Sequence, residues 1–171
     1  MTIKIRSNLF DQFDGADAES FSNDDPLQRV TLGYLINLLA RLLAQSLKVR
    51  NGPGGILPGQ FPIVLELLKA EGLTQRELCD YVKVEQGTMA NTLKRMERDG
   101  LLERYECDED ARQSRIHLTE RGANLARVAV VNALEVNKVA LSGLDEPTRA
   151  QLRSLLIGMA ERLEADLARF R

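Results

Sequence analysis

Polar side chains recur along one face of a predicted helix between Glu85 and Asp99. The amide groups of Gln86 and Asn91 have the donors and acceptors that bond adenine edges in the major groove of DNA. The Lys94 ammonium group can bond guanine acceptors in the same way. The residues of this face are Gln86, Gly87, Ala90, Asn91 and Lys94. The opposite face carries Met89, Leu93 and Met96, at a spacing that predicts the buried side of the helix.

Residues beside this polar face are suited to phosphate groups. Arg95 and Arg98 flank it, and arginine contacts to phosphates fix the register of a protein on DNA without reading its sequence. Thr88 lies near the start of the helix, where free backbone N–H groups also favour an anion. Taken alone, the helix is equally consistent with an ordinary solvated polar face.

A second group of charged residues falls on a predicted hairpin. Asp110, Arg112 and Arg115 lie at its tip or on its descending strand. An arginine inserted into a narrow minor groove meets an enhanced negative potential, and Asp110 could hold the Arg112 guanidinium in one orientation by a charge-assisted pair. Asp108 and Glu109 favour the alternative of a solvated loop, because acidic groups repel phosphates.

Other kinds of chemistry find little support. Cys79 is predicted to be a core residue, and Cys107 is the credible position for a redox-active thiol. His117 is the sole histidine, so a structural or surface role outweighs metal binding. The chain shows no paired nucleophile and base and no phosphate-binding glycine loop, which argues against an enzyme, and we expect no cofactor.

Local signals predict the elements that position the polar face. Thr74 and Glu77 fit a capping box that starts one helix. A turn at Lys83 and Val84 leads to the helix 85–99, and Gly100 follows as its expected stop. Two short strands, 101–106 and 115–118, should enclose a loop at 107–114, and Thr119 should cap a long helix.

Long amphipathic helices are predicted at both ends of the chain. The first starts near Leu27 and stops at the sequence NGPGG. A second helix, which belongs to the central unit, begins near Pro58 with Phe61, Val64, Leu65 and Leu68 facing inward. The last helix is capped by Asp145. The apolar stripes of the terminal helices exceed what a small central unit can cover, so a helical dimer is expected. The alternative is a monomeric bundle in which the stripes pack on each other.

Composition and charge are those of an ordinary soluble globular protein of 171 residues. The first 25 residues carry six acidic and two basic side chains, and the rest carries 21 basic and 19 acidic ones. Between Thr74 and Leu118 there are eight basic and ten acidic residues, so any contact with DNA must come from local placement. The first 20 residues lack the apolar segment of a signal peptide, and two cysteines suit a reducing cytoplasm.

Residues 73–122 closely resemble the winged helix-turn-helix of the MarR family of transcriptional regulators. The segments that carry this resemblance are LTQREL, MERDGLLER and DARQSRIHLTERG, at the spacing of the family. The resemblance extends upstream to ILPGQFPIVLELL and covers about residues 27–170.

This resemblance implies an obligate homodimer whose N- and C-terminal helices form the dimerisation region. It makes 85–99 the recognition helix and 101–118 the wing, with the Asp-x-Arg motif of the family at Asp110 and Arg112. It also implies that a small anionic ligand, often aromatic or phenolic, binds between the dimer helices and the DNA-binding lobe and releases DNA. Base-contact roles fall on Gln86, Gly87, Thr88, Ala90, Asn91, Lys94 and Arg95.

Three residues or segments depart from the family pattern. The turn carries Lys83 where glycine is usual, and a left-handed backbone there would cost about 1 kcal/mol, so the turn should differ locally. Position 91 holds Asn91 where relatives often have arginine, which suggests a different operator. The wing is more acidic than is usual, which argues against strong wing-mediated binding.

The sequence therefore predicts a mainly α fold with a small β-hairpin wing, a winged helix-turn-helix flanked by dimerisation helices. The expected divisions are an acidic arm (1–26), an N-terminal dimerisation helix and connector (27–55), a DNA-binding domain (56–118) and C-terminal dimerisation helices (119–171). The predicted function is a cytoplasmic homodimeric repressor that binds a pseudo-palindromic operator in double-stranded DNA and is released by a small-molecule effector. The alternative is a winged-helix adaptor that binds a protein and not DNA.

Overall fold

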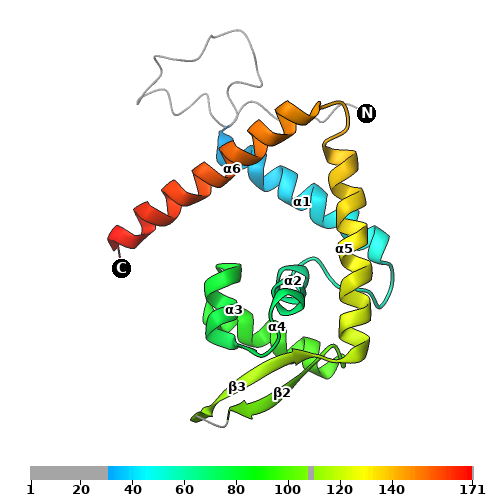
Figure 1. Cartoon of the computed structure of the whole chain (residues 1–171), viewed down its shortest axis with the longest axis vertical. Coiled ribbons are helices and arrows are strands. Elements are labelled where there is room, and N and C mark those ends of the chain that lie inside the picture. The colour runs from blue at the N-terminus through cyan, green and yellow to red at the C-terminus, as the bar shows by residue number, and fades with distance from the viewer. Residues whose placement is uncertain (1–30, 108–109, 171) are drawn as a thin grey trace.

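The computed structural model describes residues 31–107 and 110–170. Six helices and three short strands make up this part of the chain, and their arrangement is shown in Figure 1. The acidic arm and the expected helix start near Leu27 lie outside the described residues, so the first helix is described from Leu32. No helix in the described segments is long and apolar enough to cross a membrane.

The central lobe is built on one apolar core. It consists of α2 (Phe61–Lys69), α3 (Gln75–Val82), α4 (Gln86–Arg98) and a small sheet. Each helix contributes the residues of its apolar face, as expected for helices that pack around a common core. The fully buried larger side chains include Ile63, Val64 and Leu67 of α2, Leu78 of α3, and Met89, Leu93 and Met96 of α4.

The second helix differs from its prediction in its start and its inward face. It begins at Phe61 and not near Pro58, because residues 57–60 form a turn. In this turn the side-chain oxygen Oε1 of Gln60 accepts a hydrogen bond from the Leu57 N–H at 2.9 Å. Ile63 and Leu67 are buried beside the predicted Val64, whereas Phe61, Leu65 and Leu68 are only half-buried.

Three antiparallel strands form the sheet, in the order β1–β3–β2. The hairpin of β2 (Leu102–Cys107) and β3 (Asp110–Leu118) was predicted, but β3 begins at Asp110, so the expected loop at 107–114 is wrong. Backbone pairing of Glu106 with Ser114 extends the ladder through a polar segment that shows no strand pattern. The strand β1 (Leu73–Thr74), which pairs with β3, was not predicted.

Helices α1 (Leu32–Asn51) and α5 (Glu120–Ala140) pack against each other on one side of the lobe. The buried face of α5 carries small residues, and a Cβ atom added to Gly122 would overlap the backbone of Leu101. Asn132 of α5 donates a hydrogen bond to Oδ1 of Asn51 at 2.9 Å and ties α5 to the end of α1. The buried residues of α5 are Gly122, Ala126, Ala129 and Val136.

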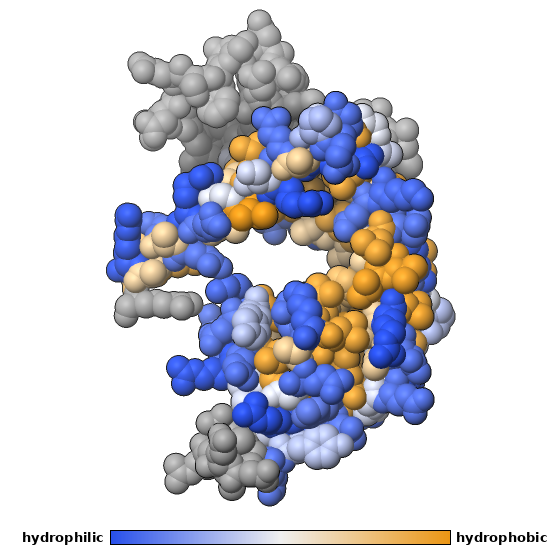
Figure 2. Space-filling view, in the orientation of Figure 1, coloured by the Kyte–Doolittle hydropathy of each residue, from blue (hydrophilic) through white to orange (hydrophobic). Residues whose placement is uncertain are grey.

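Helix α6 (Glu146–Leu167), followed by the short 3-10 turn Ala168–Phe170, extends away from the end of α5 (Figure 1). It buries none of its residues in this chain. The space-filling view in Figure 2 shows an opening between α6 and the central lobe, with apolar atoms gathered along α5 beside it. The apolar stripe of α6 is therefore not buried against α1 and α5, as a monomeric bundle would require.

Candidate nucleic-acid interface

Helix α4 presents its polar face to solvent and its apolar face to the core. Met89, Leu93 and Met96 have no exposed surface, which fixes the rotation of the helix about its axis. Ala90 is half-buried at the edge of the polar face. The exposed residues of α4 include Gln86, Gly87, Thr88, Asn91, Lys94, Arg95 and Arg98, so seven of the predicted contact residues of this helix lie together on an accessible surface.

Helix α3, which precedes α4, has a fully formed cap at its start. The Thr74 hydroxyl accepts a hydrogen bond from the Glu77 N–H at 3.2 Å, and Glu77 Oε2 accepts one from the Thr74 N–H at 2.7 Å. This capping box satisfies backbone donors at the start of α3. The hydrogen bonds from the Thr74 backbone and hydroxyl lower the pKa of Glu77, because they favour its charged form.

The turn between α3 and α4 has the left-handed backbone that glycine usually provides. Lys83 adopts φ 59° and ψ 46°, and its N–H donates to the Cys79 carbonyl oxygen at 2.8 Å. The expectation that the lysine would change the local turn is therefore wrong. The side chain tolerates a conformation that is unfavourable for residues other than glycine.

The first turn of α4 is open for contact with a ligand. Its N-cap residue, Glu85, makes no side-chain hydrogen bond to the helix. A Cβ atom added to Gly87 would have no neighbour within 4 Å, so the backbone there is accessible. Free N–H groups at a helix start favour an anion, and the adjacent Thr88 hydroxyl is exposed. Both features suit a phosphate contact.

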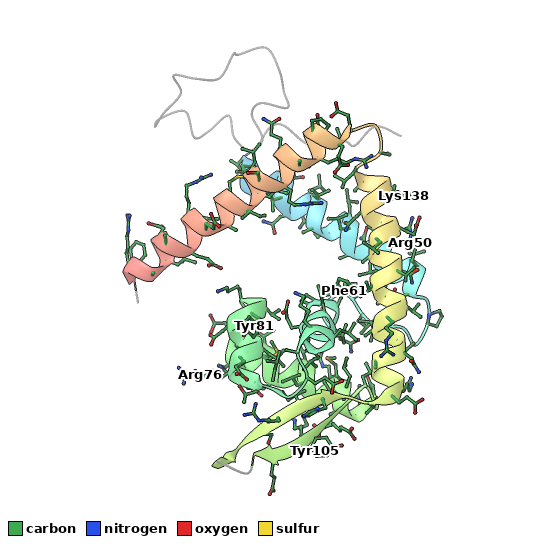
Figure 3. The ribbon with its side chains drawn as sticks, in the orientation of Figure 1. Arg50, Phe61, Arg76, Tyr81, Tyr105 and Lys138 are labelled. Atoms are coloured by element: carbon green, nitrogen blue, oxygen red, sulfur yellow. The ribbon has the colours of Figure 1, made fainter. Side chains whose placement is uncertain are left out.

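No role was predicted for Gln75, which contacts this surface. The Gln75 Nε2 group donates a hydrogen bond to Gln86 Oε1 at 3.0 Å. The next residue, Arg76, is exposed on α3 and is labelled in Figure 3. A polar residue after a helix cap carries no distinctive signal, so only the fold brings Gln75 to the recognition surface.

Two of the predicted arginines have protein partners. The Arg98 guanidinium group lies 3.1 Å from Asp99 Oδ1, and both side chains are exposed. The Arg115 Nη1 group donates to the Gly72 carbonyl oxygen at 2.9 Å, which ties β3 to the segment before β1. Arg115 is thus engaged in holding the sheet together, in addition to any outward role.

The wing motif lies on the second strand of the hairpin. Asp110 and Arg112 belong to β3, and their side chains lie outside the described part of the structure. The start of β3, to which both residues belong, lies at the end of the sheet far from α5 (Figure 1). The predicted pairing of Asp110 with Arg112 remains a prediction.

The Cys79 thiol and the His117 imidazole pack against other parts of the fold. Cys79 is buried, and its burial raises the pKa of the thiol, which disfavours the reactive thiolate. The His117 ring packs edge-on against Tyr105, with ring centres 5.2 Å apart. Among residues 31–107 and 110–170, no group of three His, Cys, Asp or Glu side chains is placed to hold a metal ion. The side chain of Cys107 lies outside the described part.

A cavity of about 220 Å³ lies where α1, α5 and the start of α2 meet. Phe61, labelled in Figure 3, lies at its wall at the start of α2. The wall has no charged side chain, and its clearest polar group is the Asn137 amide. The lining residues are Leu43, Ala44, Leu47, Pro58, Phe61, Pro62, Ala133, Val136 and Asn137.

Comparisons with known proteins match this arrangement. The MarR family model matches residues 54–113. The organic hydroperoxide resistance transcriptional regulator of Bacillus subtilis is 35% identical over 132 residues, which cover 77% of this chain and 88% of that protein. The chain belongs to the MarR family.

Solved structures of MarR-type regulators share its fold. A MarR transcriptional regulator from Methanosarcina mazei is 30% identical, with a TM-score of 0.71, and the match covers 78% of this chain and 96% of that one. The transcriptional regulator SlyA is 26% identical, with a TM-score of 0.77, over 83% of this chain and all of that one. This MarR-family chain is therefore a DNA-binding transcriptional regulator with a winged-helix fold, and not an enzyme.

Proposed function

We propose that this chain is a homodimeric, sequence-specific repressor in the cytoplasm that binds a pseudo-palindromic operator. The observation that carries the proposal is the exposed polar face of α4, held outward by three fully buried apolar side chains on its other face. Asn91 and Lys94 project from the middle of this face and are the principal base contacts. Arg95, Arg98 and the start of α4 contact phosphates.

In this proposal, the terminal helices join two copies of the DNA-binding domain as a dimer. Leu155, Leu156 and Leu163 of α6 are 55%, 43% and 64% exposed, and no element among residues 31–107 and 110–170 covers them. A second copy, related by a two-fold axis, buries the same stripe on both chains. In the proposed division, 27–55 and 119–171 are the dimerisation segments and 56–118 is the DNA-binding domain.

The dimer sets the geometry on DNA. Each α4 enters the major groove, and each wing approaches the flanking minor groove through Asp110, Arg112 and Arg115. The two half-sites are then roughly 10 bp apart, centre to centre, as for other two-fold helix-turn-helix dimers. The regulator represses by occupying this operator.

A small-molecule effector releases the operator. The cavity between α1, α2 and α5 is the proposed binding site for the effector, because it lies where the terminal helices meet the central lobe. A ligand that prefers one arrangement of these helices shifts the separation of the two α4 helices. Its apolar wall suits an aromatic ring. Cys79 is no alternative trigger, because it is buried and its thiol pKa is raised.

Fluorescence anisotropy tests the proposal. The full-length protein selects a duplex from a random pool, and its affinity is measured at several salt concentrations. We expect an enriched pseudo-palindrome and a steep loss of affinity with salt, because phosphate contacts release counterions. Asn91→Ala and Lys94→Ala should each reduce discrimination at one base pair by about tenfold. Lys138→Ala, at an exposed lysine of α5 (Figure 3), is the matched control and should bind normally.

Failure of this test has a specific meaning. If Asn91→Ala and Lys94→Ala keep the full affinity and discrimination, the assignment of α4 as the base reader is wrong. If no duplex is enriched and salt has little effect, the adaptor alternative is favoured, to which the excess of acidic residues between Thr74 and Leu118 already gives some support.

A further inference from the structure

The two helices of the recognition motif are joined by a side-chain hydrogen bond at their first residues. Gln75 begins α3 and Gln86 begins α4. The Gln75 Nε2 group donates to Gln86 Oε1 at 3.0 Å. Gln86 is exposed on the polar face of α4, and Gln75 is half-buried beside it. The bond therefore fixes an amide group that would otherwise turn freely in solvent.

We infer that Gln75 is a specificity-determining positioning residue, which orients the Gln86 amide to read an A·T base pair. This inference rests on the proposed base reading by α4. The Gln86 oxygen has two lone pairs, and Gln75 occupies one of them. The second lone pair accepts from the adenine N6 amino group, while Gln86 Nε2 donates to adenine N7. Adenine is the base that offers this donor and acceptor side by side in the major groove.

The backbone at Gln75 is held by the sheet and by the cap of α3. It follows Thr74, which is paired with Arg115 in the sheet and forms the capping box with Glu77. By contrast, Gln86 follows Glu85, which makes no side-chain cap on α4. The more strongly held helix therefore steadies the first turn of the reading helix. Fixing a long amide side chain before DNA arrives lowers the entropy lost on binding.

The orientation of the bond leaves Gln75 a second contact. One N–H of its amide donates to Gln86, and the other has no partner among the residues that the structure describes. A free amide donor next to the major groove suits a phosphate oxygen. Gln75 thus links the DNA backbone to the side chain that reads the base, so correct docking and correct base reading support each other.

A double-mutant cycle on the full-length protein tests this role. The probe is a fluorescein-labelled duplex selected by the wild-type protein from a random pool, with variants in which each base pair is replaced. Gln86→Ala locates the base pair that Gln86 reads, which we expect to be A·T. Gln75→Ala should lose about tenfold of discrimination at that same base pair. The double variant should lose no more discrimination there than Gln86→Ala does.

A second variant tests the direction of the hydrogen bond. The carboxylate of Gln75→Glu cannot donate to Gln86 Oε1, and it accepts from Gln86 Nε2 instead. The Gln86 amide is then turned over, so the preference for adenine should fall. Gln45→Ala, which removes an exposed glutamine amide from α1, is the control and should keep the preference. Thermal melting of each variant verifies that it is folded.

The outcomes separate this inference from the proposed function. If Gln75→Ala weakens binding to every duplex equally and its effect adds to that of Gln86→Ala, Gln75 contacts phosphate only and the inference is wrong. Retention of the adenine preference in Gln75→Glu also overturns it. If Gln86→Ala changes no base preference while Asn91→Ala does, the proposed function stands and the inference fails. If neither changes any preference, both fail.

Discussion

Lys83 holds the turn between α3 and α4 in a left-handed conformation at a cost. Among residues 31–107 and 110–170, it is the one residue other than glycine with a positive φ. The left-handed region costs a side chain about 1–2 kcal/mol, whereas glycine adds about 0.5–1 kcal/mol of chain entropy on folding. The Lys83 Nζ atom also lies 3.2 Å from Glu164 Oε1 of α6, but both side chains are more than half exposed, so this pair contributes little.

These quantities predict the effect of substituting Lys83. Lys83→Ala removes the ion pair but keeps the strained backbone, and Lys83→Gly removes both. We expect Lys83→Gly to be more stable than Lys83→Ala by about 0.5–1 kcal/mol. Urea denaturation at one fixed protein concentration measures the difference. Equal stability of the two variants would show that the turn is unstrained.

At the scale of the element, α3 depends on a charged cap and its stability should depend on pH. The hydrogen bonds from Thr74 lower the pKa of Glu77 in the folded chain. A carboxyl group whose pKa is lowered by folding stabilises the fold above its unfolded pKa, about 4.3, and loses this effect as the pH falls through its folded pKa. The advantage of the charged cap is therefore complete at neutral pH and absent in strong acid.

Glu77→Gln should reveal this dependence. The variant should be less stable than the wild type by about 0.3–1 kcal/mol at pH 7, because the helix start favours a negative charge. The difference should shrink as the pH falls below about 4.3. Thr74→Ser keeps the hydroxyl group and should retain the pH profile of the wild type. A difference between wild type and Glu77→Gln that is the same at pH 7 and pH 3 would contradict the prediction.

Elements whose signals are local could be predicted from the sequence. The cap at Thr74, the buried face of α4 and the stop at Gly100 all depend on residues within a few positions of each other, and all three are confirmed. The same holds for the N-caps Thr119 and Asp145. The exposed face of α4 could be predicted from its buried face, because burial of Met89, Leu93 and Met96 determines which side chains of the helix face solvent.

Features that depend on distant partners could not be predicted. The strand β1 exists because Leu73 pairs with Ile116, more than 40 residues away. Helix α5 buries its small residues, since its close approach to Leu101 leaves no room for a Cβ atom at Gly122, while its larger Val128, Val131 and Leu134 stay exposed. The role of Gln75 likewise depends on a contact between two helices.

At the scale of the whole molecule, the helices and strands of residues 31–107 and 110–170 have an open arrangement. The central lobe packs against α5, and α5 packs against α1. Helix α6 extends away from these elements and has no buried residue (Figure 1). Large exposed apolar stripes in an otherwise polar surface mark an interaction site. Helices α1, α5 and α6 each carry exposed apolar side chains, which a second chain covers in the proposed dimer.

A charge placed on the α6 stripe should therefore separate the dimer. Leu155→Glu puts a carboxylate where a leucine side chain buried in the dimer contributes about 1.5–3 kcal/mol to the association free energy. Because the interface is two-fold, the substitution is present twice in each dimer. Ser154→Glu adds the same charge on a side of α6 that points away from the stripe of Leu155, Leu156 and Leu163, and is the matched control. Light scattering after size exclusion should give a monomer for Leu155→Glu and a dimer for Ser154→Glu. The monomer should also lose most of its affinity for a two-half-site duplex while still binding one half-site weakly, because its α4 surface is unchanged. A dimeric Leu155→Glu variant at low micromolar concentration would mean that α6 does not form the interface.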